Sequence, residues 1–165
     1  MANKSKSIAF ISIYTALAMI LAYVEAKIPP LLPSVPGVKM GLPNIIIIFL
    51  LYRRGPVFAA VVSLLRIILV SMLFGNVMTL AYSAAGAALS LGVMALLKKT
   101  DRFSPVGVSL TGGVFHNLGQ VLVAMLVLET AQIGYYMIVL TLTGTVAGIL
   151  VGLAGALVLK YMKNV

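Results

Sequence analysis

Charged and turn-forming residues divide this 165-residue chain into six apolar segments. The segments cover about residues 7–26, 40–52, 56–74, 76–97, 105–128 and 132–159. A helix needs roughly twenty apolar residues to cross a ~30 Å hydrocarbon core, and every segment except the second has about that length. The pattern predicts an all-α integral membrane protein in which a six-transmembrane-helix bundle forms one membrane domain, 1–165.

The composition excludes a soluble fold. Only 9% of the residues are charged and 62% are hydrophobic, whereas soluble domains average about 25% charged residues. The absence of cysteine excludes disulfides and thiol nucleophiles. The N-terminal apolar run leads into further membrane segments, so we expect a retained first helix and not a cleaved signal peptide.

The net charge of +9 indicates a membrane topology and not a nucleic-acid partner. With six crossings and the N-terminus inside, Lys27 and Lys39 lie outside. Basic residues in short loops favour the cytoplasmic side, so both termini are expected to be cytoplasmic, in the plasma membrane. Nine cations then share that side: Lys4, Lys6, Arg53, Arg54, Lys98, Lys99, Arg102, Lys160 and Lys163.

The second segment, 40–52, is too short for a regular crossing. Two alternatives stay open from the sequence. Either this helix is strongly irregular, or the preceding IPPLLPSVPGVK, 28–39, dips into the protein and completes the crossing.

Arg66 interrupts the apolar run VVSLLRIILV, 61–70. It lies ten residues after Pro56, and His116 lies eleven after Pro105, so both are about 15 Å into the bilayer at 1.5 Å per residue. A charge at this depth costs about 2.5–3.5 kcal/mol on insertion scales, and such residues usually mark functional sites. We therefore expect Arg66 and His116 to contact a ligand.

Further polar side chains are expected at similar or shallower depth. Together they predict a cavity that opens outward and binds a partly polar or anionic ligand. A structural alternative is that Arg66 pairs with Glu25 or with backbone carbonyls, and that His116 is an interhelical hydrogen-bond donor. The predicted substrate-binding set is Arg66, His116, Asn117, Gln120, Asn44, Tyr82, Glu25 and Lys39.

Small residues repeat every four positions in two segments. Gly144, Gly148 and Gly152 permit close backbone approach, so the last helix is expected to pack tightly inside the bundle. On the first helix the spacing occurs as Ser12 with Ala16 and as Ala18 with Ala22. Internal packing or docking of another membrane subunit explains these pairs.

Catalytic motifs are missing from the sequence. It has no GxxxxGK[ST] phosphate loop, no paired carboxylates for magnesium and no His/Cys metal cluster. We expect a binding protein without enzymatic activity, metal or cofactor, whose energy input comes from elsewhere.

Three stretches carry a resemblance to a known family: VKMGLPNIIIIFLLYRRG, LLRIILVSMLFGN and GGVFHNLGQ. They resemble the Gx transporter family, which also carries the label heptaprenyl diphosphate synthase component I. The resemblance extends from about residue 7 to 160. That family is in turn similar to the substrate-binding S-components of energy-coupling factor (ECF) transporters.

The resemblance implies an S-component-like membrane subunit that binds a small vitamin- or cofactor-like molecule, with a flavin as the first candidate. Its partners would be a transmembrane coupling subunit and two ATPase subunits. Ser12 and Ala16 would contact the coupling subunit, with Ala18 and Ala22 nearby, although the stricter family motif has alanine at both positions. The alternatives are a non-catalytic accessory protein of isoprenoid or quinone metabolism, and a stand-alone channel or exporter.

Overall fold

The computed structural model describes residues 2–28 and 40–162. These residues form six α-helices and one 3₁₀ helix, and contain no strand, so the all-α prediction is confirmed for this part of the chain. The elements are α1 (Ala2–Lys27), α2 (Asn44–Arg54), α3 (Pro56–Phe74), α4 (Val77–Lys99), α5 (Pro105–Val127), η1 (Ala131–Tyr136) and α6 (Met137–Tyr161).

Five helical stretches are long and apolar enough to cross a membrane, which identifies a multi-pass membrane protein. They are Lys4–Lys27, Pro56–Phe74, Val77–Lys99, Pro105–Val127 and Ala131–Tyr161. The second predicted segment is the exception: α2 has 11 residues and a length of about 16 Å, roughly half of a crossing. The stretch 29–39, for which the sequence allows a dip into the protein, lies outside the described residues.

Local sequence signals set the helix ends. Pro56 and Pro105 occupy the first turns of α3 and α5, where the missing N–H has no intrahelical partner to lose. The Ser104 hydroxyl accepts a hydrogen bond from the Gly107 N–H at 3.2 Å, and Asn76 Oδ1 accepts from the Thr79 N–H at 2.8 Å. Gly55 links α2 to α3 with φ of 91°, a conformation that favours glycine.

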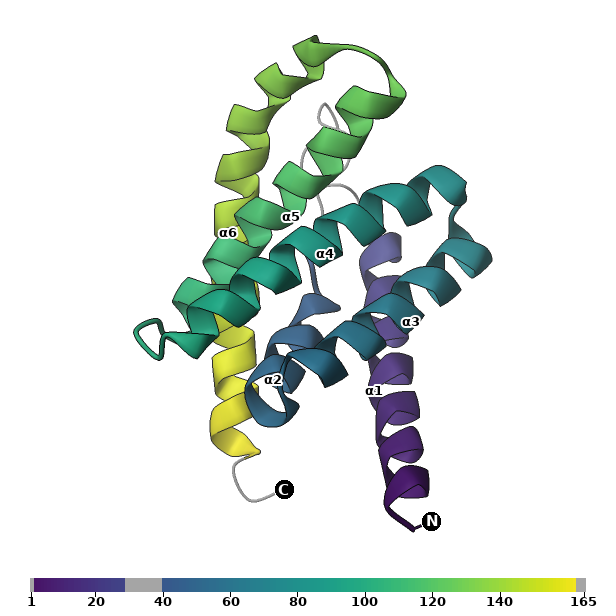
Figure 1. Ribbon diagram of the computed structural model, residues 1–165, viewed down its shortest axis with the longest axis vertical. Helices are drawn as coiled ribbons and strands as arrows, with labels where there is room; N and C mark the ends of the chain where they lie inside the picture. Colours follow the sequence, from purple (N-terminus) through teal and green to yellow (C-terminus); the bar gives the residue numbers. More distant parts are fainter. Residues whose placement is uncertain (1, 29–39, 163–165) are drawn as a thin grey trace.

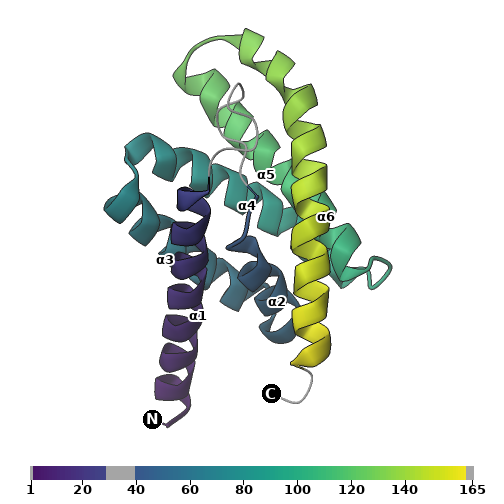
Figure 2. The ribbon, with the colours of Figure 1, turned by 180° about the vertical axis from the view of Figure 1, so that it is seen from behind.

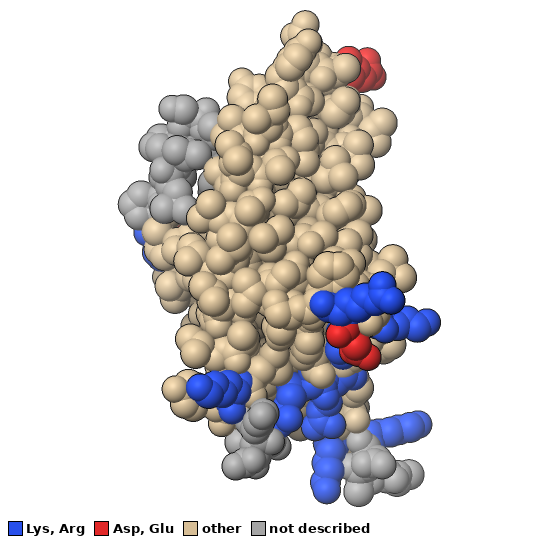
Figure 3. Space-filling model, turned by 90° about the vertical axis from the view of Figure 1, so that its left-hand side faces the viewer, with Lys and Arg blue, Asp and Glu red and all other residues tan. Residues whose placement is uncertain are grey.

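Successive helices run in opposite directions, so the start of α1 and the end of α6 lie at the same end of the bundle (Figures 1 and 2). Lys and Arg side chains gather at this end (Figure 3). Lys27 is the last residue of α1 and lies toward the opposite end of the bundle. We call the end of the bundle where α1 starts and α6 ends the basic end. It is defined by Lys4, Lys6, Arg53, Arg54, Lys98, Lys99, Arg102 and Lys160.

The half-length helix α2 forms the centre of the bundle near the basic end. Its residues 47–51 are at most 3% exposed and belong to a cluster to which α3, α4, α5 and α6 also contribute. We call this cluster the α2 core, with Ile47, Ile48, Phe49, Leu50, Leu51, Ala59, Val62, Met94, Val108 and Val151. The Tyr14 ring of α1 stacks on Phe49 with the ring centroids 5.6 Å apart.

Side chains at the basic end fasten α2 to its neighbours. The Lys98 ammonium donates to the Leu51 carbonyl at 2.6 Å, and the Arg53 guanidinium donates to the Met162 carbonyl at 2.8 Å. The Arg54 guanidinium lies 4.5 Å from the Phe10 ring centroid. These contacts satisfy carbonyls at two helix C-termini and attach α2 to α4, α6 and α1.

Glycines hold α5 and α6 close together. A Cβ atom at Gly148 would lie 2.7 Å from Leu110 Cα, and one at Gly152 would lie 2.7 Å from Val106 Cα. Gly144 likewise faces the backbone of Gly113. The structure confirms that the glycine repeat packs the last helix tightly inside the bundle.

Candidate ligand cavity

A cavity of about 370 Å³ is lined by residues from all six α-helices. Its volume lies within the range of roughly 300–1,000 Å³ that is common for small-molecule sites. Because α2 begins only at Asn44, no helical turn of α2 fills the space beyond that residue. Met40, Gly41 and Pro43, which precede α2, also line the cavity.

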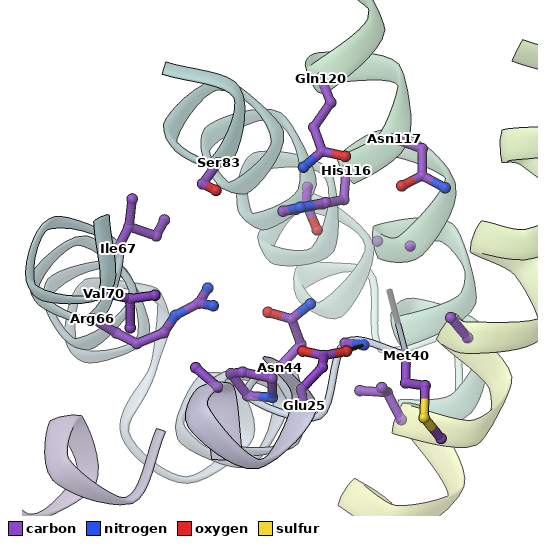
Figure 4. Close-up of a pocket in the computed structure, with 18 of the residues that line it drawn as sticks. Glu25, Met40, Asn44, Arg66, Ile67, Val70, Ser83, His116, Asn117 and Gln120 are labelled. Carbon is purple, nitrogen blue, oxygen red and sulfur yellow. Dashed lines mark hydrogen bonds between the residues drawn. The ribbon is translucent and has the colours of Figure 1, made fainter. Parts of the chain in front are cut away.

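Arg66 is the cation of the cavity among the described lining residues. Figure 4 shows its side chain extending from α3 into the cavity, toward the side chains of α1, α2 and α5. Its Nε atom is buried and has no hydrogen-bond partner in the described part of the chain. A buried donor without a partner costs about 1–3 kcal/mol, and more when the group is charged.

Glu25 and Asn44 lie on the α1 and α2 side of the same cavity (Figure 4). The Glu25 carboxylate accepts a hydrogen bond from the Gly41 N–H, which ties the end of α1 to the approach to α2. Within the described ranges, no carboxylate comes within 4.0 Å of the Arg66 nitrogens. The structural alternative of a direct Arg66–Glu25 ion pair is therefore not observed.

His116 and Gln120 extend from α5 into the cavity opposite Arg66 (Figure 4). They are four residues apart and so share one face of α5. Gly86 of α4 gives them room, since a Cβ there would lie 3.0 Å from the His116 ring and 3.1 Å from the Gln120 side chain. Close packing of α4 on α5 therefore positions both side chains.

Asn117 lines the cavity but turns toward α6 (Figure 4). Its Nδ2 donates to the Leu140 carbonyl at 2.6 Å, so this amide also joins α5 to α6. Tyr82 is not among the lining residues, and its neighbour Ser83 lines the cavity instead. Because consecutive residues of a helix point about 100° apart, Ser83 can face the cavity while Tyr82 does not. Lys39 lies outside the described residues.

Several lining hydroxyl groups do not belong to the predicted binding set. On α4 they are spaced four and seven residues apart, and Ser109 lies seven residues before His116. Both spacings place side chains on one helix face, so this signal is present in the sequence. The residues are Ser71, Thr79, Ser83, Ser90 and Ser109.

The two small-residue pairs of α1 lie on different faces. Ser12 and Ala16 are exposed, beside exposed apolar side chains such as Ile13 and Ile20. Ala18 is fully buried, and Ala22 lines the cavity. Internal packing therefore accounts for Ala18 and leaves the Ser12–Ala16 pair on the outer surface.

The family model described as heptaprenyl diphosphate synthase component I matches residues 14–158. The chain belongs to this family. No curated protein matches, and no solved structure matches. The match to heptaprenyl diphosphate synthase component I includes the described polar residues of the cavity, Arg66 and His116 among them.

The described lining residues offer groups of both charges and several neutral hydrogen-bonding groups. In the part of the chain that the structure describes, no group of three or more His, Cys, Asp or Glu could hold a metal ion. The "component" in the family description indicates that the protein works with partner subunits.

Proposed function

We propose that this protein is the substrate-binding membrane subunit, or S-component, of an ECF-type transporter. It binds a small vitamin- or cofactor-like molecule in the cavity and works without catalysis. The basic end faces the cytoplasm with both termini, in the plasma membrane, in keeping with the positive-inside rule. A flavin is the first candidate for the ligand.

The observation that carries the proposal is the placement of the buried Arg66 side chain at the cavity. A guanidinium within an apolar membrane helix is expensive unless a partner compensates it. Its Nε has no hydrogen-bond partner among the described residues, and the side chain faces a cavity of ligand size (Figure 4). A bound acceptor group would supply the missing partner, with His116, Gln120 and Asn44 adding hydrogen bonds.

The exposed face of α1 supports a membrane partner. Ser12 and Ala16 lie on this face, and small residues allow a second helix to approach closely. In the proposed complex this face contacts a transmembrane coupling subunit, and two ATPase subunits supply the energy. Buried Ala18 and cavity-lining Ala22 would not contribute directly.

The family description favours one alternative, a non-catalytic accessory protein of isoprenoid or quinone metabolism. A lipid-like ligand would then occupy the same cavity. Affinity purification of the tagged protein from its native membrane separates the two functions. Copurifying ATPase and coupling subunits support the transporter, and a copurifying prenyltransferase supports the alternative.

Release of the bound molecule tests the ligand site. The wild type, Arg66→Met and the matched control Leu64→Met are purified in mild detergent and denatured, and the released molecules are identified by absorbance and mass spectrometry. Leu64 lies on α3 and is 54% exposed. We expect about one vitamin-like molecule per wild-type or control protein and a loss of at least tenfold in Arg66→Met. Equal amounts in all three proteins would falsify the role of Arg66.

A further inference from the structure

The described residues that line the cavity carry one positive and one negative charge. Among its described lining residues, Arg66 is cationic and Glu25 is anionic, and the others carry hydroxyl, amide, imidazole or apolar side chains. A site built for several negative charges gathers several cations or holds magnesium on carboxylates. This cavity has neither arrangement in the part of the chain that the structure describes.

Both charged groups are held where a ligand can reach them. The Gly41 N–H donates to one Glu25 oxygen, which fixes the carboxylate at the cavity wall. Arg66 approaches from α3 without a carboxylate within 4.0 Å in the described ranges. Figure 4 shows the two groups on neighbouring sides of the same space. Each can therefore contact a different part of one ligand.

The rest of the lining limits the shape of that ligand. Ile67, Val70 and Phe74 of α3 and Val151 of α6 supply apolar surface. His116 and Gln120 supply hydrogen-bonding groups across from Arg66 (Figure 4). A largely apolar body with a few polar groups at its edge matches these walls.

We propose that the cavity selects an unphosphorylated ligand whose net charge is zero or −1. A carboxylate or a carbonyl oxygen accepts hydrogen bonds from Arg66, and a donor group of the ligand faces Glu25. This inference rests on the proposed function only in that the cavity binds a ligand. Phosphate and diphosphate esters are disfavoured, because the described lining residues include one cation, Arg66, and Glu25 repels additional negative charge in a poorly screened site.

A cavity with this preference disfavours the kind of diphosphate named in the family description. It holds for either proposed function, since it concerns the charge of the ligand and not the partner subunits. A prenyl lipid without phosphate satisfies it, and a prenyl diphosphate does not.

Competition between matched molecules tests the inference. Purified protein is incubated with equal concentrations of riboflavin and flavin mononucleotide, and separately with farnesoic acid and farnesyl diphosphate. Native mass spectrometry reads which member of each pair is bound. We expect the unphosphorylated member of a binding pair to be favoured at least tenfold.

Glu25→Gln provides the second arm, because glutamine keeps the acceptor for Gly41 and removes the charge. The preference should fall at least threefold in this variant. Preferred binding of a phosphorylated member, or an unchanged preference in Glu25→Gln, overturns the inference and leaves the proposed ligand site intact.

If the protein binds neither pair of probes, the molecule released from the denatured wild-type protein provides the test. A phosphorylated molecule overturns the inference alone, and an unphosphorylated one supports it. If no molecule is released and no probe binds, the inference and the proposed function both fail.

Discussion

The α2 core and the cavity are neighbours within one bundle, but they differ in how their buried groups are packed and hydrogen-bonded. In the α2 core, apolar side chains are almost completely buried, and nearby Lys98 and Arg53 are hydrogen-bonded to backbone carbonyls. In the cavity, the Arg66 Nε is buried without such a partner among the described residues. Both arginines are cations at helical positions, but in the described part of the chain the Arg53 guanidinium is hydrogen-bonded to a backbone carbonyl and the Arg66 Nε is not.

From this difference we propose that stability and ligand binding are separated along the bundle. Packing and satisfied hydrogen bonds near the basic end stabilise the fold. The cavity instead contains the buried Arg66 Nε, which has no hydrogen-bond partner among the described residues and in the proposed function gains one from a ligand. The following predictions test this separation, from the largest effect on stability to the smallest.

Gly152→Leu should abolish the folded protein, because even a Cβ at this position would lie 2.7 Å from Val106 Cα and 3.0 Å from Ser109 Cβ. Gly92→Leu is the matched control, since a Cβ there meets no atom within 4 Å. Size-exclusion chromatography in detergent gives the yield of monodisperse protein. A normal yield of Gly152→Leu would show that the α5–α6 contact is not needed for folding.

Leu50→Ala should destabilise the protein by about 2–5 kcal/mol, because it removes a fully buried side chain and leaves a cavity in the α2 core. Leu64→Ala, on the exposed side of α3, should change stability by less than about 0.5 kcal/mol. Thermal unfolding followed by circular dichroism measures both. Similar effects at the two positions would contradict the central place of α2.

Asn117→Ala should lower stability by about 0.6–1.7 kcal/mol, between the average and the maximum measured for interhelical hydrogen bonds in a membrane protein. It removes the 2.6 Å bond to the Leu140 carbonyl. Gln120→Ala changes an amide on the same helix that makes no hydrogen bond within the described residues, and it should leave unfolding unchanged. Reversed effects would assign Asn117 to the ligand and Gln120 to the fold.

Arg66→Met should leave the stability of the ligand-free protein unchanged or raise it by about 1 kcal/mol, because it removes a charge whose Nε has no partner among the described residues. Arg53→Met is the matched control and should lower stability by about 1 kcal/mol, since it loses the bond to the Met162 carbonyl. Both are compared by thermal unfolding. A strongly destabilised Arg66→Met would make this residue a structural element and remove the contrast between the two regions.

The sequence predicts most of the helical architecture, because the signals are local. Pro56, Pro105 and the charged residues at helix ends set the boundaries, and apolar length identifies the long spans. The short second segment and the Gly144, Gly148 and Gly152 repeat are also visible in the sequence. The largest differences are at three helix starts: α1 begins at Ala2, five residues earlier than predicted, α2 begins at Asn44, four residues later, and the last segment begins as the 3₁₀ helix η1.

The tertiary structure decides which side chains line the cavity. Apolar helices in a membrane show little difference between their inner and outer faces, so the sequence does not fix how each helix is rotated about its axis. Packing of α4 on α5 points Ser83 into the cavity, excludes Tyr82 from its lining and makes room for His116 beside Gly86. Contact with α6 draws the amide of Asn117 to Leu140. The chain by itself determines which segments are helices and where its polar groups lie in depth, and only the packing of helix against helix determines which of those groups meet.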